Sequence, residues 1–125
     1  MKNFLEKIVA QKKKDLKVIK KKVSLTSIDN KIKSMKIFFD FKKTLINQGK
    51  KKKVSLIAEI KKASPSAGII IKDFHPVKIA NLYFNNNVTC LSVLTEENFF
   101  LGNLDYVTDI KKKIKLPILA KDFFI

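Results

Sequence analysis

Two patterns of apolar residues divide the chain. Over residues 3–23, apolar side chains recur at helical spacing with lysines on the opposite face, which predicts an amphipathic helix. From residue 54 onward the pattern changes to short continuous apolar runs, which are Val54–Ile60, Val88–Leu94 and Leu116–Ala120. These runs are rich in Val, Ile and Leu and too short for helices, so they predict buried β-strands.

Helical patterns separate the three apolar runs. Pro76–Asn87 begins with a proline suited to a first helical turn and carries an apolar stripe. Asn103–Lys113 has a capping asparagine, an acid in its first turn and lysines in its last, as the helix dipole favours. The alternation of strand and helix predicts an α/β fold with parallel strands joined by right-handed crossovers.

The region between the first helix and the first strand gives weaker patterns. Ser24–Asn30 is polar and predicts a turn, Lys36–Leu45 predicts a short helix or an anchoring segment, and Asn47–Lys53 predicts a solvated loop. We therefore expect a lysine-rich helical extension over residues 1–53 and a sheet-containing part over residues 54–125.

The third predicted strand is followed only by a few residues, through Ile125. Three parallel strands cannot close a barrel, and both faces of a parallel sheet need cover. The pattern therefore predicts that the chain is the truncated first part of a larger α/β domain.

The charge is strongly positive and uneven. The net charge is +16, and the first 62 residues hold 20 of the 27 lysines. The sequence contains no arginine, the residue that nucleic-acid readers use for bidentate contacts, and its abundance of Lys, Asn, Ile and Phe is typical of AT-rich codon usage. We expect solvated lysines and no specific nucleic-acid partner. The basic first helix could lie on an anionic membrane, but packing on a domain surface is favoured.

Cellular location is indicated by three features. Cys90 is the only cysteine and lies in an apolar run, which fits a core residue in a reducing compartment. No apolar run reaches the roughly 18 residues of a membrane span. The N-terminus lacks the apolar core of a signal peptide. The sequence predicts a cytoplasmic protein without membrane contact.

Charged and hydroxyl side chains gather where the predicted strands end. Glu59 and Lys61 occupy alternate positions of the first strand, so they share a face, and Ser64 and Ser66 follow in a polar loop. Lys121 ends the third strand. Active sites of α/β sheets lie at the carboxyl ends of strands, where a lysine can be tuned into a proton donor. A single such lysine is more often salt-bridged, but three converging charges favour catalysis.

Other polar residues are not expected to take part in catalysis or metal binding. Glu96 and Glu97 follow the second strand without the spacing of a metal site, and we expect both to be solvated. His75 precedes a proline and is expected to be a loop or cap residue. No metal site is predicted.

Three segments carry a resemblance to a known family. IAEIKKASPSAG, LSVLTEENFFLGN and LPILAKDFFI resemble indole-3-glycerol phosphate synthase, and the resemblance runs from about Phe4 to Ile125. It implies a TIM (β/α)8 barrel with an N-terminal helical extension, of which this chain would hold the first three βα units. Leu101 and Asn103 depart from the family, which often has a polar residue and a serine there.

The resemblance also implies a reaction and catalytic residues. The family closes a pyrrole ring on 1-(2-carboxyphenylamino)-1-deoxy-D-ribulose 5-phosphate, with loss of CO₂ and water. Lys121 matches the family's general acid, and Lys61 matches the lysine that holds the anionic substrate. Glu59 matches the glutamate that pairs with this second lysine and orients it.

Substrate-binding residues follow from the same resemblance. Ser64 and Ser66 lie in the loop that contacts the substrate, while Phe100 and Phe123 match apolar walls around its aromatic ring. The implied partner is a phosphorylated small molecule, and no metal or organic cofactor is implied. The family's general base and phosphate loops would lie beyond Ile125. We therefore expect the chain to be inactive alone and to need a C-terminal half-barrel.

Alternatives remain open. A lysine-rich fragment that binds nucleic acid or a membrane surface without catalysis is the second hypothesis, but it does not explain the charges at three strand ends. A decayed gene product that never folds stably and a phosphate-binding barrel of another pathway are weaker hypotheses.

Overall fold

The computed structural model describes residues 3–51 and 54–125, and the chain divides into two compact units. One unit holds the residues up to Phe38 together with Phe123–Ile125, and the other holds Phe39–Asp122. The predicted boundary between residues 53 and 54 adjoins positions outside the described residues, and it stays a prediction.

The first unit contains two helices, α1 (Phe4–Lys22) and α2 (Leu25–Ser34). The prediction of α1 is confirmed, and its first turn is capped by the side chain of Asn3. The prediction of a turn at Ser24–Asn30 is wrong. The Ser24 hydroxyl accepts a hydrogen bond from the Ser27 amide at 3.1 Å, and this cap begins α2.

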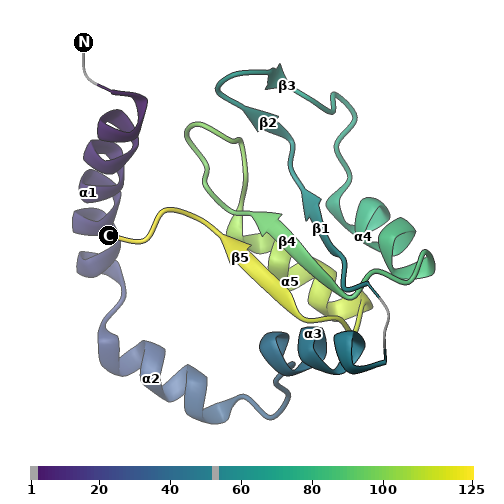
Figure 1. Ribbon diagram of the computed structural model, residues 1–125. Coiled ribbons are helices and arrows are strands. Elements are labelled where there is room, and N and C mark those ends of the chain that lie inside the picture. Colours follow the sequence, from purple (N-terminus) through teal and green to yellow (C-terminus); the bar gives the residue numbers. More distant parts are fainter. Residues whose placement is uncertain (1–2, 52–53) are drawn as a thin grey trace. The chain divides into compact units, whose positions relative to one another are not determined.

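The second unit begins with helix α3 (Phe41–Lys50), which lies beside the amino ends of the strands (Figure 1). The Asp40 carboxylate caps it by accepting a hydrogen bond from the Lys43 amide at 2.8 Å. Residues 47–50 are therefore helical, where a loop was predicted, and residues 52–53 of that loop lie outside the described residues. The Ser55 hydroxyl donates to the Leu45 carbonyl at 3.0 Å, which ties α3 to the chain that enters the sheet.

The sheet of the second unit has three parallel strands in the order β1 (Ile57–Ile60), β4 (Cys90–Leu94) and β5 (Ile118–Lys121). All three predicted strands are confirmed, although each begins two or three residues later than its apolar run. The central strand β4 is buried along its whole length and pairs with a neighbouring strand on each side.

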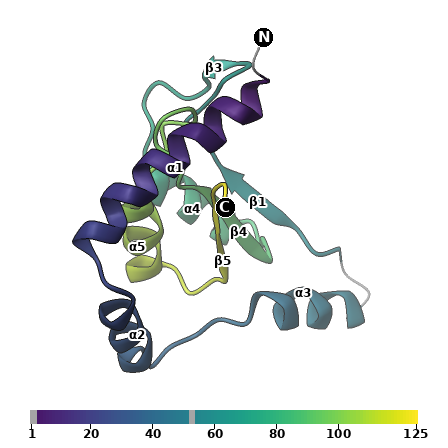
Figure 2. The same cartoon turned by 90° about the vertical axis from the view of Figure 1, so that its left-hand side faces the viewer.

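Two helices, α4 (Pro76–Asn85) and α5 (Leu104–Lys113), connect the strands and cover one face of the sheet (Figures 1 and 2). Both confirm the predicted alternation. The core between the helices and the sheet is apolar, and its buried members are Ile60, Ala80, Val88, Leu91, Val93, Ile110 and Ile114.

A short hairpin was not predicted. Strands β2 (Ala63–Ser64) and β3 (Gly68–Ile69) pair antiparallel within the polar segment after β1. Gly68 has φ +65°, a left-handed conformation that glycine adopts without steric cost. The hairpin and the loop after β4 both lie at the carboxyl ends of the parallel strands (Figure 1).

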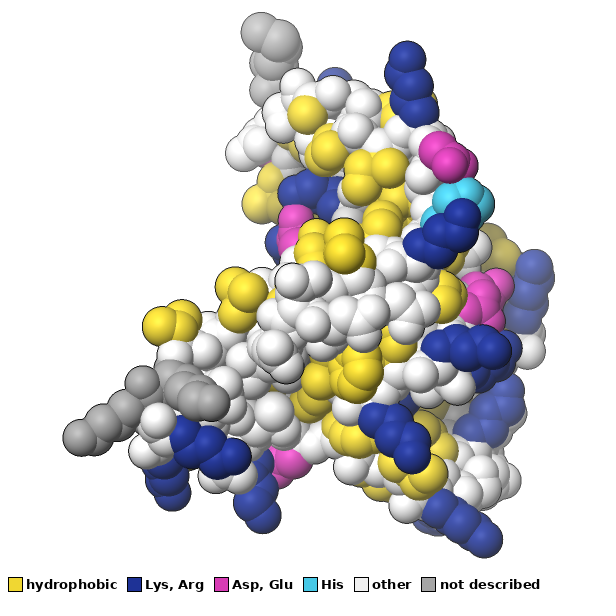
Figure 3. All heavy atoms as spheres, turned by 90° about the vertical axis from the view of Figure 1, so that its right-hand side faces the viewer, with side chains coloured by type: hydrophobic (Ala, Val, Ile, Leu, Met, Phe, Trp, Pro, Cys, Tyr) yellow, Lys and Arg dark blue, Asp and Glu magenta, His cyan; other side chains and the backbone are white. Residues whose placement is uncertain are grey.

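Several apolar side chains of the sheet region remain exposed. The exposed fractions are 89% for Val54, 53% for Leu56, 44% for Ile57 and 47% for Leu119. Figure 3 shows one face of the molecule, where apolar side chains lie between scattered lysines. Among the helices of the described residues, none combines the length and apolar character that a membrane crossing needs.

Candidate active site

Three charged side chains meet at the carboxyl edge of the sheet. The Glu59 carboxylate accepts a hydrogen bond from Lys61 Nζ on its Oε1 atom at 2.6 Å and one from Lys121 Nζ on its Oε2 atom at 2.7 Å. The side chains are 31% exposed for Glu59 and Lys61 and 52% exposed for Lys121. One carboxylate thus bridges Lys61, which directly follows β1, and Lys121, which ends β5, and both cations remain accessible to a ligand.

Strand register creates this meeting point. Glu59 pairs with Ser92 across β1 and β4, and Lys121 pairs with Leu94 across β4 and β5, so both charges lie at the same edge. The backbone of Lys121 is fixed further, because its carbonyl accepts a hydrogen bond from the Thr95 amide at 3.0 Å. The site charges therefore stand on strand ends rather than on a free loop.

The charge on Glu59 follows from its neighbours. Burial raises the pKa of its carboxyl, but the hydrogen bonds and positive charges of Lys121 and Lys61 lower this pKa by more than burial raises it. The pKa of Glu59 therefore lies below its ordinary value. The carboxylate is ionised at neutral pH and holds both ammonium groups close together. Two ammonium groups held at one edge of the sheet can bind an anionic group of a ligand and can give a proton to an oxygen atom.

The predicted loop serines lie in the β2–β3 hairpin. The Ser64 hydroxyl accepts a hydrogen bond from the Ala67 amide at 3.1 Å and lies 3.4 Å from the Ser66 hydroxyl. Their shared position makes a small hydroxyl cluster directly after β1.

The loop after β4 holds Phe100, one of the predicted apolar walls. This loop also contains a residue whose prediction is wrong, because Glu96 is 1% exposed rather than solvated. Its carboxylate accepts hydrogen bonds from the loop's own backbone, including the Phe100 amide at 3.1 Å. Glu97 is exposed, as predicted.

Phe123, the other predicted wall, belongs to the first unit. It borders a cavity of about 220 Å³ within that unit, whose lining consists of Lys12, Asp15, Leu16, Ile19, Phe123, Phe124 and Ile125. The remaining predicted site residues, Glu59, Lys61, Ser64, Ser66, Phe100 and Lys121, all belong to the second unit.

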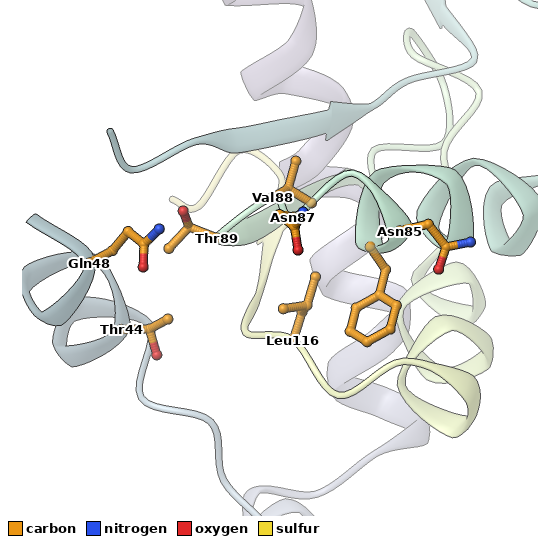
Figure 4. A pocket seen from close by; sticks show the side chains of 8 residues that line it. Thr44, Gln48, Asn85, Asn87, Val88, Thr89 and Leu116 are labelled. Carbon is orange, nitrogen blue, oxygen red and sulfur yellow. The ribbon is translucent and has the colours of Figure 1, made fainter. Parts of the chain in front are cut away.

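A larger cavity of about 820 Å³ lies in the second unit at the opposite, amino-terminal edge of the sheet (Figure 4). Its described lining is uncharged and consists of Thr44, Gln48, Phe84, Asn85, Asn87, Val88, Thr89 and Leu116. None of the predicted site residues lines it. His75, by comparison, is at the N-cap of α4 and pairs with Asp73 at 2.9 Å, so it is a cap-position residue as predicted.

Comparison with known proteins assigns the family. The model of the indole-3-glycerol phosphate synthase family matches residues 5–125. An indole-3-glycerol phosphate synthase of Alkaliphilus metalliredigens is 48% identical over 122 residues, covering 98% of this chain and 46% of the relative. The synthase of Acetivibrio thermocellus is 47% identical over 124 residues, covering 98% and 46%. That of Trichodesmium erythraeum is 44% identical over 124 residues, covering 99% and 41%.

This chain therefore spans less than half the length of these curated relatives. The parallel order of β1, β4 and β5 with intervening helices α4 and α5 is the arrangement of the first three strands of a (β/α)8 barrel and the two helices that connect them. Sequence match and strand order agree: the chain belongs to the indole-3-glycerol phosphate synthase family.

Proposed function

We propose that this chain supplies the general acid and the substrate-binding lysine of an indole-3-glycerol phosphate synthase active site. Lys121 is the general acid, Lys61 holds the anionic substrate, and Glu59 orients both lysines. The observation that carries the proposal is the single carboxylate bridging Lys61 and Lys121 at 2.6 and 2.7 Å. The family relationship supports the same roles, because members carry out this ring closure.

The proposed chemistry begins with ring closure. The aromatic carbon that bears the substrate's carboxylate attacks the carbonyl carbon of the ribulose chain, and Lys121 gives a proton to the carbonyl oxygen as negative charge develops there. Loss of CO₂ returns the bonding electrons to the ring. A further proton transfer lets the new hydroxyl leave as water, while the neighbouring CH₂ carbon gives up one proton to the general base and the double bond of the pyrrole ring forms. These are acid–base steps, and the proposal needs no metal or organic cofactor.

Substrate binding rests on the surrounding side chains. The substrate is a phosphorylated small molecule that also carries a carboxylate, and the ammonium groups of Lys61 and Lys121 complement its negative charge. The hydroxyls of Ser64 and Ser66 offer hydrogen bonds to it. Phe100 provides apolar surface for the aromatic ring.

A second chain or segment completes the proposed enzyme. This chain covers 41–46% of the relatives cited above, so the larger part of the family barrel has no counterpart in its 125 residues. We propose that a C-terminal half-barrel pairs with the sheet and contributes the general base and the phosphate-binding loops. The exposed apolar residues of the β1 region and of β5 are the surface that such pairing would cover.

We also propose that the protein acts in the cytoplasm. Cys90 is a free, fully buried thiol, and the chain has no second cysteine with which to form an internal disulfide. A reducing compartment suits this composition.

Turnover is the direct test. The purified chain is incubated with 1-(2-carboxyphenylamino)-1-deoxy-D-ribulose 5-phosphate, alone and with the C-terminal part of the Alkaliphilus metalliredigens relative. Indole fluorescence reports the product, and this chain contributes no tryptophan emission because it has no tryptophan. We expect product only when both parts are present.

Variants assign the roles. Lys121→Met should lower the rate by roughly 10²- to 10⁴-fold, the usual contribution of a general acid. Lys115→Met changes an exposed lysine that lies before the other end of β5; it is the matched control and should leave the rate unchanged. Full activity of Lys121→Met, or no product from any combination of wild-type parts, would refute the proposed function.

A further inference from the structure

Glu96 makes an unusual set of hydrogen bonds. It is 1% exposed, and its carboxylate accepts from three consecutive backbone amides. Oε1 accepts from Asn98 at 3.1 Å, while Oε2 accepts from Phe99 at 2.7 Å and from Phe100 at 3.1 Å. Burying a carboxylate is costly unless its oxygens are hydrogen-bonded, and these amides supply that compensation. The loop is therefore folded around this side chain.

The other end of the loop is equally constrained. The Gly102 amide donates to the Glu96 carbonyl at 2.7 Å, which closes the loop on its first residue. A Cβ atom on Gly102 would lie 2.4 Å from the Leu94 carbonyl oxygen, so only glycine fits. Leu101 has φ +52°, a left-handed conformation that is strained for a non-glycine residue. Such strain persists where the surrounding contacts over-determine the backbone.

The same strand end supports Lys121. Thr95, the residue before Glu96, donates its amide to the Lys121 carbonyl at 3.0 Å and its hydroxyl to Asp122 Oδ2 at 3.1 Å. Two adjacent residues thus fix two different parts of the carboxyl edge. Thr95 holds the end of β5, and Glu96 holds the loop that carries Phe100.

We propose that Glu96 is a positioning residue for this active site. Its carboxylate sets the backbone of residues 96–102 so that Phe100 is presented in one fixed orientation to the ring of the substrate. The claim that Phe100 contacts substrate rests on the proposed function, whereas the claim that Glu96 fixes the loop rests on geometry alone. The two claims are tested separately.

Hydrogen exchange of the 125-residue chain tests the geometry. In Glu96→Gln only one acceptor oxygen remains, and in Glu96→Ala none remains. We expect the exchange of the Asn98, Phe99 and Phe100 amides to accelerate by at least about tenfold in the alanine variant and by less in the glutamine variant, while β4 amides are unchanged. Glu97→Gln, at the exposed neighbouring position, is the control and should alter none of them.

Two results would overturn the loop assignment. One is unchanged exchange of the three amides in both Glu96 variants. The other is acceleration spread evenly over β4 as well, which would make Glu96 a general stabilising residue. If Glu96→Ala fails to fold, Glu96→Gln decides between these outcomes.

Kinetics of the two-part enzyme test the positioning role. If Glu96 acts through Phe100, Glu96→Gln should raise KM by about tenfold with a smaller change in kcat, because ring binding is weakened more than proton transfer. Phe100→Ala should then cost several-fold less in the Glu96→Gln background than in the wild type. Additive effects of the two substitutions would overturn the positioning role. Absence of product from the wild-type parts would refute the proposed function, and the exchange experiment would still decide the loop assignment.

Discussion

The three glycines of the chain allow one substitution to be compared in three surroundings. Gly102→Ala is the decisive case, because its new Cβ would lie 2.4 Å from the Leu94 carbonyl oxygen and 2.9 Å from the Glu96 carbonyl oxygen. Both obstacles are backbone atoms, which cannot rotate away as a side-chain end would. The backbone of the loop after β4 must therefore shift to admit one methyl group.

The expected magnitude follows from this overlap. Overpacking of a methyl group costs about 1–3 kcal/mol, and a clash with fixed backbone belongs at the upper end, so we expect Gly102→Ala to lower the free energy of unfolding by about 3 kcal/mol. Gly49→Ala has no atom within 4 Å of the new Cβ and lies in α3, where alanine is favoured by about 0.5–1 kcal/mol. Gly68→Ala also has open space, but its φ of +65° costs about 1–2 kcal/mol.

Urea denaturation followed by far-ultraviolet circular dichroism measures all three variants against the wild type. Gly49 and Gly102 belong to the same compact unit, so their effects are read from the same unfolding transition. The expected order of stability is Gly49→Ala above wild type, then Gly68→Ala, then Gly102→Ala. Equal stability of Gly102→Ala and Gly49→Ala would refute the close approach at the loop after β4.

Further predictions concern three other sites. The pKa of Glu59 is lowered in the folded chain. Its ion pairs with Lys61 and Lys121 therefore stabilise the fold fully above the unfolded-state pKa of about 4.3. This stabilisation is lost as the pH falls through the lower pKa of the folded state. Glu59→Gln should thus lower the free energy of unfolding by about 1 kcal/mol at pH 7 in urea titrations, and a difference that persists at pH 2 would contradict this. Burial leaves Cys90 0% exposed and raises the pKa of its thiol, so a disulfide reagent at pH 8 should label it only as fast as the chain opens; immediate labelling in native buffer would contradict its burial. Leu101→Asn should raise the thermal midpoint, with a gain of about 1 kcal/mol, because asparagine tolerates the φ of +52° better than leucine does; a lower midpoint would show that the leucine side chain outweighs this strain.

The strands and the charges at their ends were predictable because both follow simple periodic rules. Apolar runs located β1, β4 and β5, and the alternate positions of Glu59 and Lys61 placed them on one face. Parallel order then brought Lys121 to the same edge. The catalytic roles of these residues stay predictions.

The features that the sequence analysis missed depend on hydrogen bonds between residues a few positions apart, and not on the periodic spacing of apolar residues. Helix α2 was overlooked because its polar start resembles a turn, although Ser24 is a good N-cap and Ile28 and Ile32 recur at helical spacing. The burial of Glu96 could not be read from spacing, because its hydrogen-bond donors are the backbone amides of its own loop. The available signal was an acid two residues after the end of an apolar strand, followed six residues later by Gly102.

The exposed margins of the sheet have a consequence for handling the protein. Within the described residues, β1 and β5 each pair with a neighbour on one side only, and Val54, Leu56 and Leu119 add exposed apolar surface. Exposed edge strands favour pairing between two molecules of this chain, whereas a net charge of +16 makes the molecules repel each other. Salt screens that repulsion over about 10 Å at 0.1 M ionic strength. Raising the salt concentration should therefore drive the isolated chain toward aggregates, and dilute buffer should keep it dispersed.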